Sequence, residues 1–366
     1  MAKITSTIWP KDPHTEAKHV ILENHLKAWF PILSSTFGRV VYLDGFAGPG
    51  VYSKGEEGSP VISLRTAINH MFNKKFGDIT FAFIEKEPKR AEKLKEVLKE
   101  KFPTLPPNLT YQVYNGEFAA TMEETLASLE KDGLKLAPTF AFIDPFGYRH
   151  FPMKTIAHLM SHERCEVLIT FMYDYVNRFA EIQKDALNEL FGDDSWQKNE
   201  IPKDPKLRKD FFLNHYESHL KSIAGVKYIR TFEMIRNDGH TEYFLVFGTN
   251  HPKGMEVMKN AMYQADSRGL YRFSDREDPS QTYLTNVDSP DSWIPNAAKV
   301  VYEQFKGKKV GVPSIKDFVW TRTRFLFKSG ILGYLEIQNP PKIKVHGRKR
   351  SGLNYPDRCI IEFNSV

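Results

Sequence analysis

Short apolar runs recur along the first half of the chain, and each stops at a polar residue or a turn. A strand buried in a parallel sheet is apolar along most of its length, because helices cover both faces of such a sheet. Between the runs, apolar residues recur every three or four positions, as Leu94, Val97 and Leu98 do within residues 88–101, and this spacing is typical of an amphipathic helix. The pattern predicts strands at residues 40–43, 80–84, 109–114, 138–143 and 166–171.

The alternation of strands and helices predicts an α/β fold with a doubly wound, mostly parallel sheet. Two further strands, at residues 228–234 and 242–248, are close enough in sequence to pair antiparallel, which brings the expected sheet to seven strands. The polar helical region at about residues 183–225 is interpreted as an insertion that covers one edge of this sheet. A helix near the N-terminus is expected to start with Thr15 as its cap and to turn an apolar stripe towards the core.

The end of the chain has a different pattern. It predicts two short helices, a longer helix and two alternating strands, at residues 296–305, 313–320, 323–337, 342–345 and 359–363. Three helices followed by a hairpin are the organisation of a winged helix-turn-helix domain. We therefore expect a first domain over residues 1–290 and a small winged-helix domain over residues 291–366.

Composition excludes several classes of protein. The chain has 366 residues, of which 41% are hydrophobic, and its mean hydropathy is −0.44. No apolar run approaches the ~18 residues of a membrane span, and the start lacks the apolar core of a signal peptide, so a cytoplasmic protein without membrane contact is expected. The two cysteines, Cys165 and Cys359, form neither a disulfide framework nor a zinc pattern, and no metal is expected.

Positive charge is concentrated in the tail. Residues 295–366 contain 14 lysines and arginines against 5 acidic residues, a formal charge of +9, whereas the whole chain carries +6. A basic hairpin suits the phosphate backbone of nucleic acid, with DNA favoured over RNA. A docking or dimerisation module with a solvated basic loop is the alternative. The candidate phosphate contacts are Lys342, Lys344, Arg348, Lys349 and Arg350.

The first strand ends at Asp44 and leads into a turn with two glycines, Gly48 and Gly50. Glycine lacks a Cβ, so the backbone N–H groups of such a turn can approach a ligand closely. Dinucleotide-binding folds carry their acidic residue about 20 positions after the glycines, but here it precedes them. Asp44-x-Phe46-x-Gly48-x-Gly50 therefore resembles the first motif of Rossmann-like class I methyltransferases, whose carboxylate receives the ammonium group of S-adenosyl-L-methionine. A tight turn with a solvated aspartate is the alternative.

This resemblance implies roles for three more residues. Glu85, at the end of the second strand, matches the carboxylate that binds the cofactor ribose; the alternative is the polar start of a helix. Glu117, after the third strand, would face the adenine, and Lys18, on the N-terminal helix, would bind the methionine carboxylate. Tyr173 and Tyr175 follow the fifth strand and either line a target pocket or pack in the core.

The fourth strand leads into Asp144-Pro145-Phe146-Gly147. Amino-group methyltransferases have Asp, Asn or Ser followed by two prolines and an aromatic residue here, and these residues hold the target amine and stack on the base. Asp144 and Pro145 match this motif, whereas Phe146 replaces the second proline; this departure leaves the target and catalysis itself open, and an ordinary Asp-Pro turn is the alternative. A cytosine C5 methyltransferase would need a thiolate at this point, which the chain does not have.

Together the motifs resemble the three-Cys-motif partner protein family (TcmP), whose members are methyltransferase-like. The resemblance rests on the order and spacing of residues 14–15, 18, 29, 42–50, 83–85, 143–147, 173–174, 177–179 and 247–252. It implies a class I methyltransferase fold, S-adenosyl-L-methionine as cofactor, and a partner protein that carries the cysteine motif. We therefore expect a methyltransferase-like protein that acts on or binds nucleic acid. A non-catalytic adaptor that keeps the fold for binding is the alternative, and a nucleotide-binding oxidoreductase is disfavoured.

Overall fold

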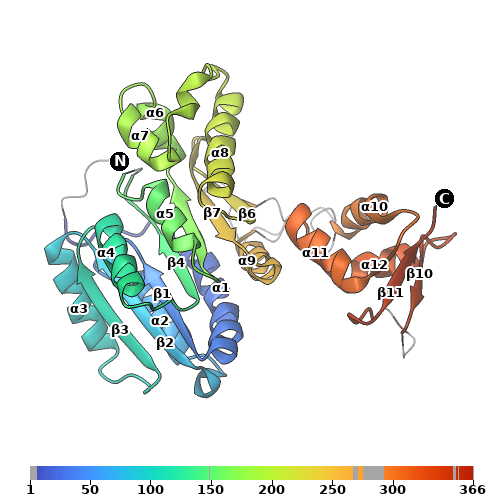
Figure 1. Cartoon of the computed structure of the whole chain (residues 1–366), viewed down its shortest axis with the longest axis horizontal. Helices are drawn as coiled ribbons and strands as arrows, with labels where there is room; N and C mark the ends of the chain where they lie inside the picture. Colours follow the sequence, from blue (N-terminus) through green and yellow to red (C-terminus); the bar gives the residue numbers. More distant parts are fainter. Residues whose placement is uncertain are drawn as a thin grey trace. The chain divides into compact units, whose positions relative to one another are not determined.

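The computed structural model of the chain describes residues 6–147, 149–266, 271–274, 292–348, 352 and 354–365 (Figure 1). The chain divides into two compact units. The N-terminal unit comprises Met1–Ala265 with Arg272–Glu277, and the C-terminal unit comprises Asp266–Tyr271 with Asp278–Val366. The domain boundary predicted at residues 290 and 291 lies outside the described residues.

The described part of the N-terminal unit is built on an eight-stranded sheet with the order β3-β2-β1-β4-β5-β7-β6-β8. Strands β1 to β5 are parallel, and β7 pairs antiparallel with both β5 and β6. These seven strands form the predicted doubly wound, Rossmann-like and mostly parallel sheet. The strands span Arg39–Asp44 (β1), Asp78–Glu85 (β2), Leu109–Asn115 (β3), Thr139–Ile143 (β4), Glu166–Phe171 (β5), Tyr228–Ile235 (β6), Thr241–Thr249 (β7) and Arg272–Ser274 (β8).

The prediction of seven strands is one short, because β8 pairs in parallel with β6. This strand has only three residues, too few for an alternating pattern to identify it. It occupies the edge of β6 that a seven-stranded sheet would leave with unpaired backbone groups.

Helices cover both faces of the sheet. In the N-terminal unit they span Pro13–Phe37 (α1), Ser59–Ile68 (α2), Pro88–Lys101 (α3), Phe118–Lys131 (α4), Met153–Met160 (α5), Tyr173–Phe179 (α6), Lys184–Phe191 (α7), Pro205–Ser222 (α8) and Pro252–Ala265 (α9), with short 3₁₀ turns at Asn73–Lys75 (η1) and Ser195–Lys198 (η2). Helix α3 has the predicted bounds, and α7, η2 and α8 occupy the predicted insertion.

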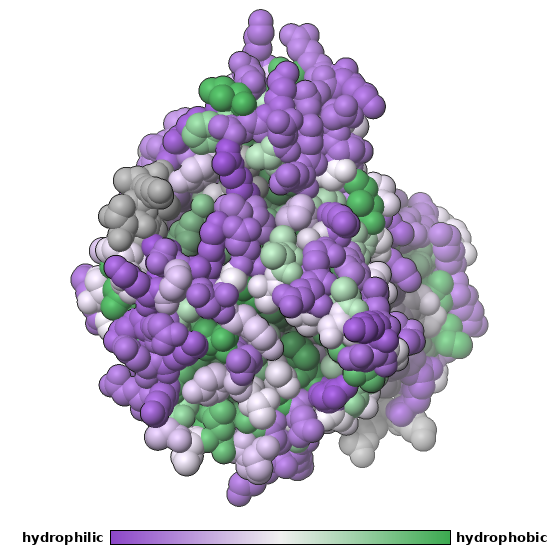
Figure 2. All heavy atoms as spheres, turned by 60° about the vertical axis from the view of Figure 1, so that its left-hand side comes forward, coloured by the Kyte–Doolittle hydropathy of each residue, from purple (hydrophilic) through white to green (hydrophobic). Residues whose placement is uncertain are grey.

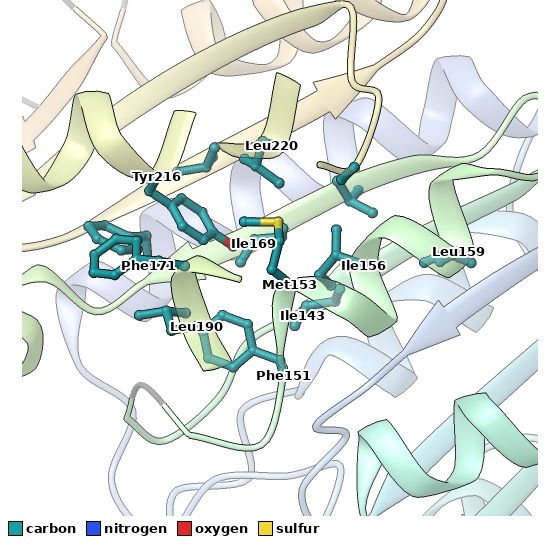
Figure 3. Close-up of a cluster of buried hydrophobic side chains, with 14 of the residues drawn as sticks. Ile143, Phe151, Met153, Ile156, Leu159, Ile169, Phe171, Leu190, Tyr216 and Leu220 are labelled. Atoms are coloured by element: carbon teal, nitrogen blue, oxygen red, sulfur yellow. The ribbon is translucent and has the colours of Figure 1, made fainter. Parts of the chain in front are cut away.

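Successive residues of β1 face the two layers of helices. The ring of Tyr42 packs against Phe140, with ring centroids 6.3 Å apart, and Trp29 of α1 approaches the same Phe140 at 6.0 Å. The next residue, Leu43, belongs to the opposite cluster, which includes residues of α4, α5, α7 and α8. Figure 3 shows side chains of β4, β5, α5, α7 and α8 meeting in this second cluster. The alternation follows from the two-residue period of a strand.

Helix α1 starts earlier than predicted. Its N-cap is Asp12, whose Oδ1 accepts a hydrogen bond from the Thr15 N–H at 2.7 Å, and Pro13 is the first helical residue. The prediction that Thr15 caps the helix is wrong, since proline fits the first helical position, where its missing N–H costs nothing.

The C-terminal unit combines three helices with a three-stranded antiparallel sheet of order β10-β11-β9 among its described residues. The elements span Ile294–Phe305 (α10), Lys309–Gly311 (β9), Val312–Arg322 (α11), Ser329–Glu336 (α12), Ile343–His346 (β10) and Ile360–Phe363 (β11). The helix predicted at residues 323–337 is shorter, because Thr323 has an extended backbone and its Oγ1 accepts the Phe325 N–H. Strand β9 was not predicted.

The molecular surface is polar where Figure 2 displays it. Hydrophilic side chains cover most of this face, and apolar side chains form separate patches among them. Among the described residues, the helices are all too short or too polar to span a bilayer.

Candidate functional site

A cavity of about 540 Å³ lies beyond the carboxyl ends of β1, β4 and β5. Its volume is that of a small-molecule site, and open α/β sheets bind their ligands at this edge. The lining comes from the N-terminal segment, the loop after β1, the turn after β4 and the ends of β5 and β7. It consists of Trp9, Pro10, Asp12, Thr15, Lys18, Phe46, Ala47, Pro49, Gly50, Val51, Tyr52, Gly58, Ser59, Arg90, Asp144, Pro145, Phe146, Gly147, Thr170, Met172, Tyr175, Glu242 and Tyr243.

The loop after β1 turns on its two predicted glycines, both in the left-handed region, with φ of 62° at Gly48 and 79° at Gly50. Glycine adopts this conformation without steric cost. A Cβ on Gly50 would lie 2.7 Å from Leu94 Cδ1, whereas a Cβ on Gly48 would meet only the Trp9 ring, at 3.6 Å. Packing therefore requires a glycine at position 50, and the backbone conformation alone favours one at position 48.

Asp44 is fully buried at the start of this loop. Its Oδ1 accepts the Phe46 N–H at 3.3 Å, and its Oδ2 has no hydrogen-bond partner among the described residues. Burial raises the pKa of this carboxyl to about 7, and the negative charges of Asp144 and Glu85 act in the same direction. A buried carboxylate with an unused oxygen is a natural acceptor for a ligand cation.

Glu85 fastens the loop to the end of β2. Its Oε2 accepts the Gly48 N–H at 2.9 Å and its Oε1 accepts the Glu87 N–H at 2.7 Å. Burial raises the pKa of Glu85, while these two hydrogen bonds oppose the rise. Both carboxylate oxygens of Glu85 thus already accept a backbone hydrogen bond, and a ribose hydroxyl would have to donate to the second lone pair of one of them.

Asp144 and Lys18, for which the sequence predicts separate ligand groups, contact each other. Lys18 Nζ donates to Asp144 Oδ2 at 2.5 Å, and Thr170 Oγ1 donates to Asp144 Oδ1 at 2.6 Å. Lys18 is buried, and its ammonium lies 5.4 Å from the centre of the Tyr243 ring. The aspartate that would hold a target amine therefore binds a lysine amine here.

Aromatic residues and one arginine surround the turn after β4. The ring of Phe146 is 56% exposed and meets Trp9 edge-on, with centroids 5.1 Å apart. The Arg90 guanidinium lies 4.8 Å from the Trp9 ring centre and 5.8 Å from that of Phe146. Such a group can stack on a planar ligand.

Several predicted residues lie elsewhere. Glu117 is an exposed residue paired with Lys86, which lowers its pKa, and it is absent from the cavity lining. Asp44, Gly48 and Glu85 support the first loop from behind the lining. Phe46, Gly50, Asp144, Pro145, Phe146 and Lys18 all line the cavity.

The cavity also contains residues that the sequence analysis did not identify. Trp9, Tyr52, Arg90 and Tyr243 have no motif that marks them, whereas Thr170 at the end of β5 had a usable signal in its position at the carboxyl edge. The Tyr243 hydroxyl has no hydrogen-bond partner among the described residues, and burial raises its pKa well above the usual value. Of the two tyrosines after β5, Tyr175 lines the cavity, while Tyr173 is part of the core.

In the C-terminal unit, the predicted phosphate contacts differ in their surroundings. The Arg348 guanidinium donates to Glu336 and to the Gly352 carbonyl, and Glu336 also accepts from Tyr355 at 2.5 Å. Lys344 is exposed on β10, and the Lys342 ammonium lies 5.3 Å from the Tyr302 ring centre. Lys349 and Arg350 lie outside the described residues.

The chain was compared with known proteins. No protein-family model and no curated protein matches it. Among solved structures, a complex of Trm1 from Pyrococcus horikoshii with S-adenosyl-L-methionine is similar, with 12% sequence identity and a TM-score of 0.40 over 70% of this chain. The match spans 61% of the Trm1 chain. The fold assignment therefore rests on the strand order and directions described above.

Proposed function

We propose that the protein is an S-adenosyl-L-methionine-dependent methyltransferase that acts on an amino group of nucleic acid. One observation supports this proposal above the others: the loop after β1 and the Asp144 turn, far apart in sequence, border a single cavity at the carboxyl edge of the parallel sheet. In open α/β sheets this edge is the ligand-binding position.

The described residues fit this cofactor in three respects. Asp44, whose Oδ2 is unpartnered and suits an ammonium group, begins the loop after β1. That loop borders the cavity through Phe46, Ala47 and Pro49, and the volume of about 540 Å³ is sufficient for a nucleoside. When bound, S-adenosyl-L-methionine supplies a methyl group on a positively charged sulfur. Lys18 is proposed to meet the cofactor's carboxylate. Glu117 lies outside the cavity lining, so the proposal that it meets the adenine requires it to leave Lys86.

The chain's own task is then to position the attacking nitrogen. Asp144 and the Pro145 carbonyl would accept the two hydrogens of the target amine, leaving its lone pair free to attack, and Phe146 with Trp9 would stack on the base. Asp144 now holds the Lys18 ammonium, so a target amine has to replace that lysine. The lysine is in turn released to pair with a ligand carboxylate.

A non-catalytic adaptor is the second candidate function. Both carboxylate oxygens of Asp144 are already hydrogen-bonded within the protein, to Lys18 and Thr170. If the Lys18 ammonium stays on Asp144 when ligands bind, it occupies the position proposed for the target amine, and the fold would serve for binding only.

The remaining assignments extend the same proposal. The C-terminal unit is proposed to be a winged-helix module that contacts DNA through Lys342, Lys344, Lys349 and Arg350, whereas the predicted contact Arg348 binds Glu336 and the Gly352 carbonyl instead. The chain is proposed to belong to the three-Cys-motif partner family, to work with a protein that carries the cysteine motif, and to act in the cytoplasm. These assignments rest on the sequence resemblance and on the +9 charge of residues 295–366.

Calorimetric titration with S-adenosylhomocysteine tests the cofactor assignment before any substrate is known. We expect a dissociation constant on the order of micromolar. We expect Gly48→Val to abolish binding, because it strains the backbone between Ala47 and Pro49, two residues that line the cavity. Gly55→Val is the matched control, because Gly55 also has a positive φ, of 85°, but its neighbours Lys54 and Glu56 do not line the cavity. Binding of NAD in place of S-adenosylhomocysteine, or equal losses in the two variants, would contradict the assignment.

A further inference from the structure

We infer that the helical insertion contains a metal-ion site formed by Asp193, His215 and His219, and that Zn²⁺ is the ion it fits. One carboxylate oxygen of Asp193 and one ring nitrogen of each histidine all lie within 4.8 Å of one another. The histidines are four residues apart on α8, so their rings leave the same face of the helix. Asp193 lies in the loop between α7 and η2, which folds back onto that face.

The hydrogen bonds around the histidines turn the Nε2 atoms of both towards one point. His219 Nδ1 lies 2.7 Å from the Phe191 carbonyl oxygen and 3.9 Å from Asp193 Oδ1. A carbonyl only accepts hydrogen bonds, so Nδ1 carries the proton and Nε2 keeps a lone pair for a metal. Nε2 of His215 and Nε2 of His219 approach the same atom, Ser195 Oγ, at 3.4 and 3.3 Å.

The protein holds this group of ligands in place but leaves it open to solvent. Tyr216 and Leu220, which follow the two histidines on α8, are fully buried in the core (Figure 3). Asp193 is exposed, and the histidines are half-buried with ring centroids 4.2 Å apart.

Two imidazoles and a carboxylate are a ligand set that Zn²⁺ accepts in a tetrahedral site, with water in the fourth position. The exposed Asp193 side chain can rotate towards the two rings to reach the ~2.0–2.2 Å of a zinc–ligand bond. A bound ion would tie the loop at residues 192–198 to α8 and so stabilise the insertion. The sequence analysis expected no metal, because the ligands form no recognised motif and meet only in the folded chain.

Metal titration of the full-length, tag-free protein tests this site. After removal of metals with a chelator, Co²⁺ should bind in one equivalent with the visible absorption of a tetrahedral complex, and Zn²⁺ should displace it and raise the melting temperature. Losing one ligand in His219→Gln or Asp193→Asn should weaken binding by about 100-fold or more, beyond the 10- to 100-fold typical of outer-shell changes.

The matched control is His158→Gln. His158 and His162 are also four residues apart, but both ring nitrogens of His158 contact carboxylates, of Glu123 and Glu130, so this variant should bind Co²⁺ like the wild type. Asp193→Asn changes an exposed side chain and keeps the test valid if a histidine variant fails to fold. Absence of the cobalt absorption in folded wild type, or unchanged affinity in both folded ligand variants, would overturn the inference.

Discussion

Glu85 and Asp144 are both carboxylates at the carboxyl edge of one sheet, yet the protein holds them differently. Glu85 accepts hydrogen bonds from two backbone N–H groups, those of Gly48 and Glu87. Asp144 accepts from two side chains, the Lys18 ammonium and the Thr170 hydroxyl. The first arrangement joins two loops of the fold, whereas the second joins side chains that line a cavity.

This difference separates a structural carboxylate from an exchangeable one. Backbone donors move only if the loop itself rearranges, so removing Glu85 leaves the buried Gly48 N–H and the partly buried Glu87 N–H without their acceptor. Side chains can rotate to new partners. Lys18 and Asp144 both border the cavity, where a bound ligand would supply new hydrogen-bond partners. We therefore expect changes at Glu85 to affect mainly folding, and changes at Asp144 to affect mainly chemistry.

The most severe test of this contrast is Glu85→Ala. Two hydrogen bonds to a charged group contribute about 1.5 to 3 kcal/mol each, so the free energy of unfolding should fall by about 3 to 6 kcal/mol. Glu87→Ala is the control, since Glu87 is exposed and its side chain does not cap α3. Urea unfolding followed by circular dichroism measures the free energy of unfolding of both variants. A similar decrease in the two would contradict the structural role assigned to Glu85.

At the exchangeable carboxylate, Asp144→Ala should reduce methyl transfer by about 100-fold or more, because it removes the acceptor that positions the amine and a misplaced nucleophile reacts slowly. The affinity for S-adenosylhomocysteine should stay nearly unchanged, since Asp144 acts on the attacking amine. Thr170→Val is the control: it removes one hydrogen bond to Asp144 and keeps the charge. If Asp144→Ala lowers only the melting temperature and any transfer persists, the turn is structural and the contrast with Glu85 fails.

The third test uses pH and the buried Asp44. Its pKa is raised to about 7 in the folded protein, above the ordinary value of 3.8, so the folded state binds more protons than the unfolded state between these values. The stability that the wild type has at low pH is therefore lost as pH rises towards 7. Compared with that of the Asp44→Asn variant, the wild type's free energy of unfolding should fall by roughly 2 kcal/mol between about pH 5 and about pH 8. If the free energy of unfolding changes with pH in the same way in the wild type and the variant, Asp44 does not titrate in this range.

Changes in the C-terminal tail are expected to alter DNA binding and to have the smallest effect on ligand binding in the cavity. Lys349→Ala/Arg350→Ala should lower the slope of log K against log salt for duplex DNA by about 2, at roughly 0.9 per phosphate contact, while S-adenosylhomocysteine binds as before. Arg348→Ala alone should change this slope little, because its guanidinium already binds Glu336 and Gly352. Anisotropy titrations at several salt concentrations compare the wild type with the two variants. An unchanged slope in the double variant would favour a protein-docking role for the hairpin.

Local patterns predicted most of the fold. Helix α3 and strands β1 to β7 have a periodicity that burial on one or two faces imposes directly on the sequence. The same patterns predicted the ends of elements less well, since Asp12 rather than Thr15 caps α1. They also missed β8 and β9, which have three residues each. In such short strands the pairing comes from a neighbouring strand and leaves little trace in the residues themselves.

By itself, the sequence determined which residues lie at the carboxyl edge: the glycine turn after Asp44, Glu85, and Asp144 with Phe146. Only the tertiary structure decided their partners. The pair Lys18–Asp144 joins residues 126 positions apart, and the bond from Gly48 to Glu85 joins residues 37 positions apart. Residue types and spacing do not encode such contacts, because they depend on how strands are ordered across the sheet. For the same reason Trp9 and Arg90, and the group Asp193, His215 and His219, were recognised only in the folded chain.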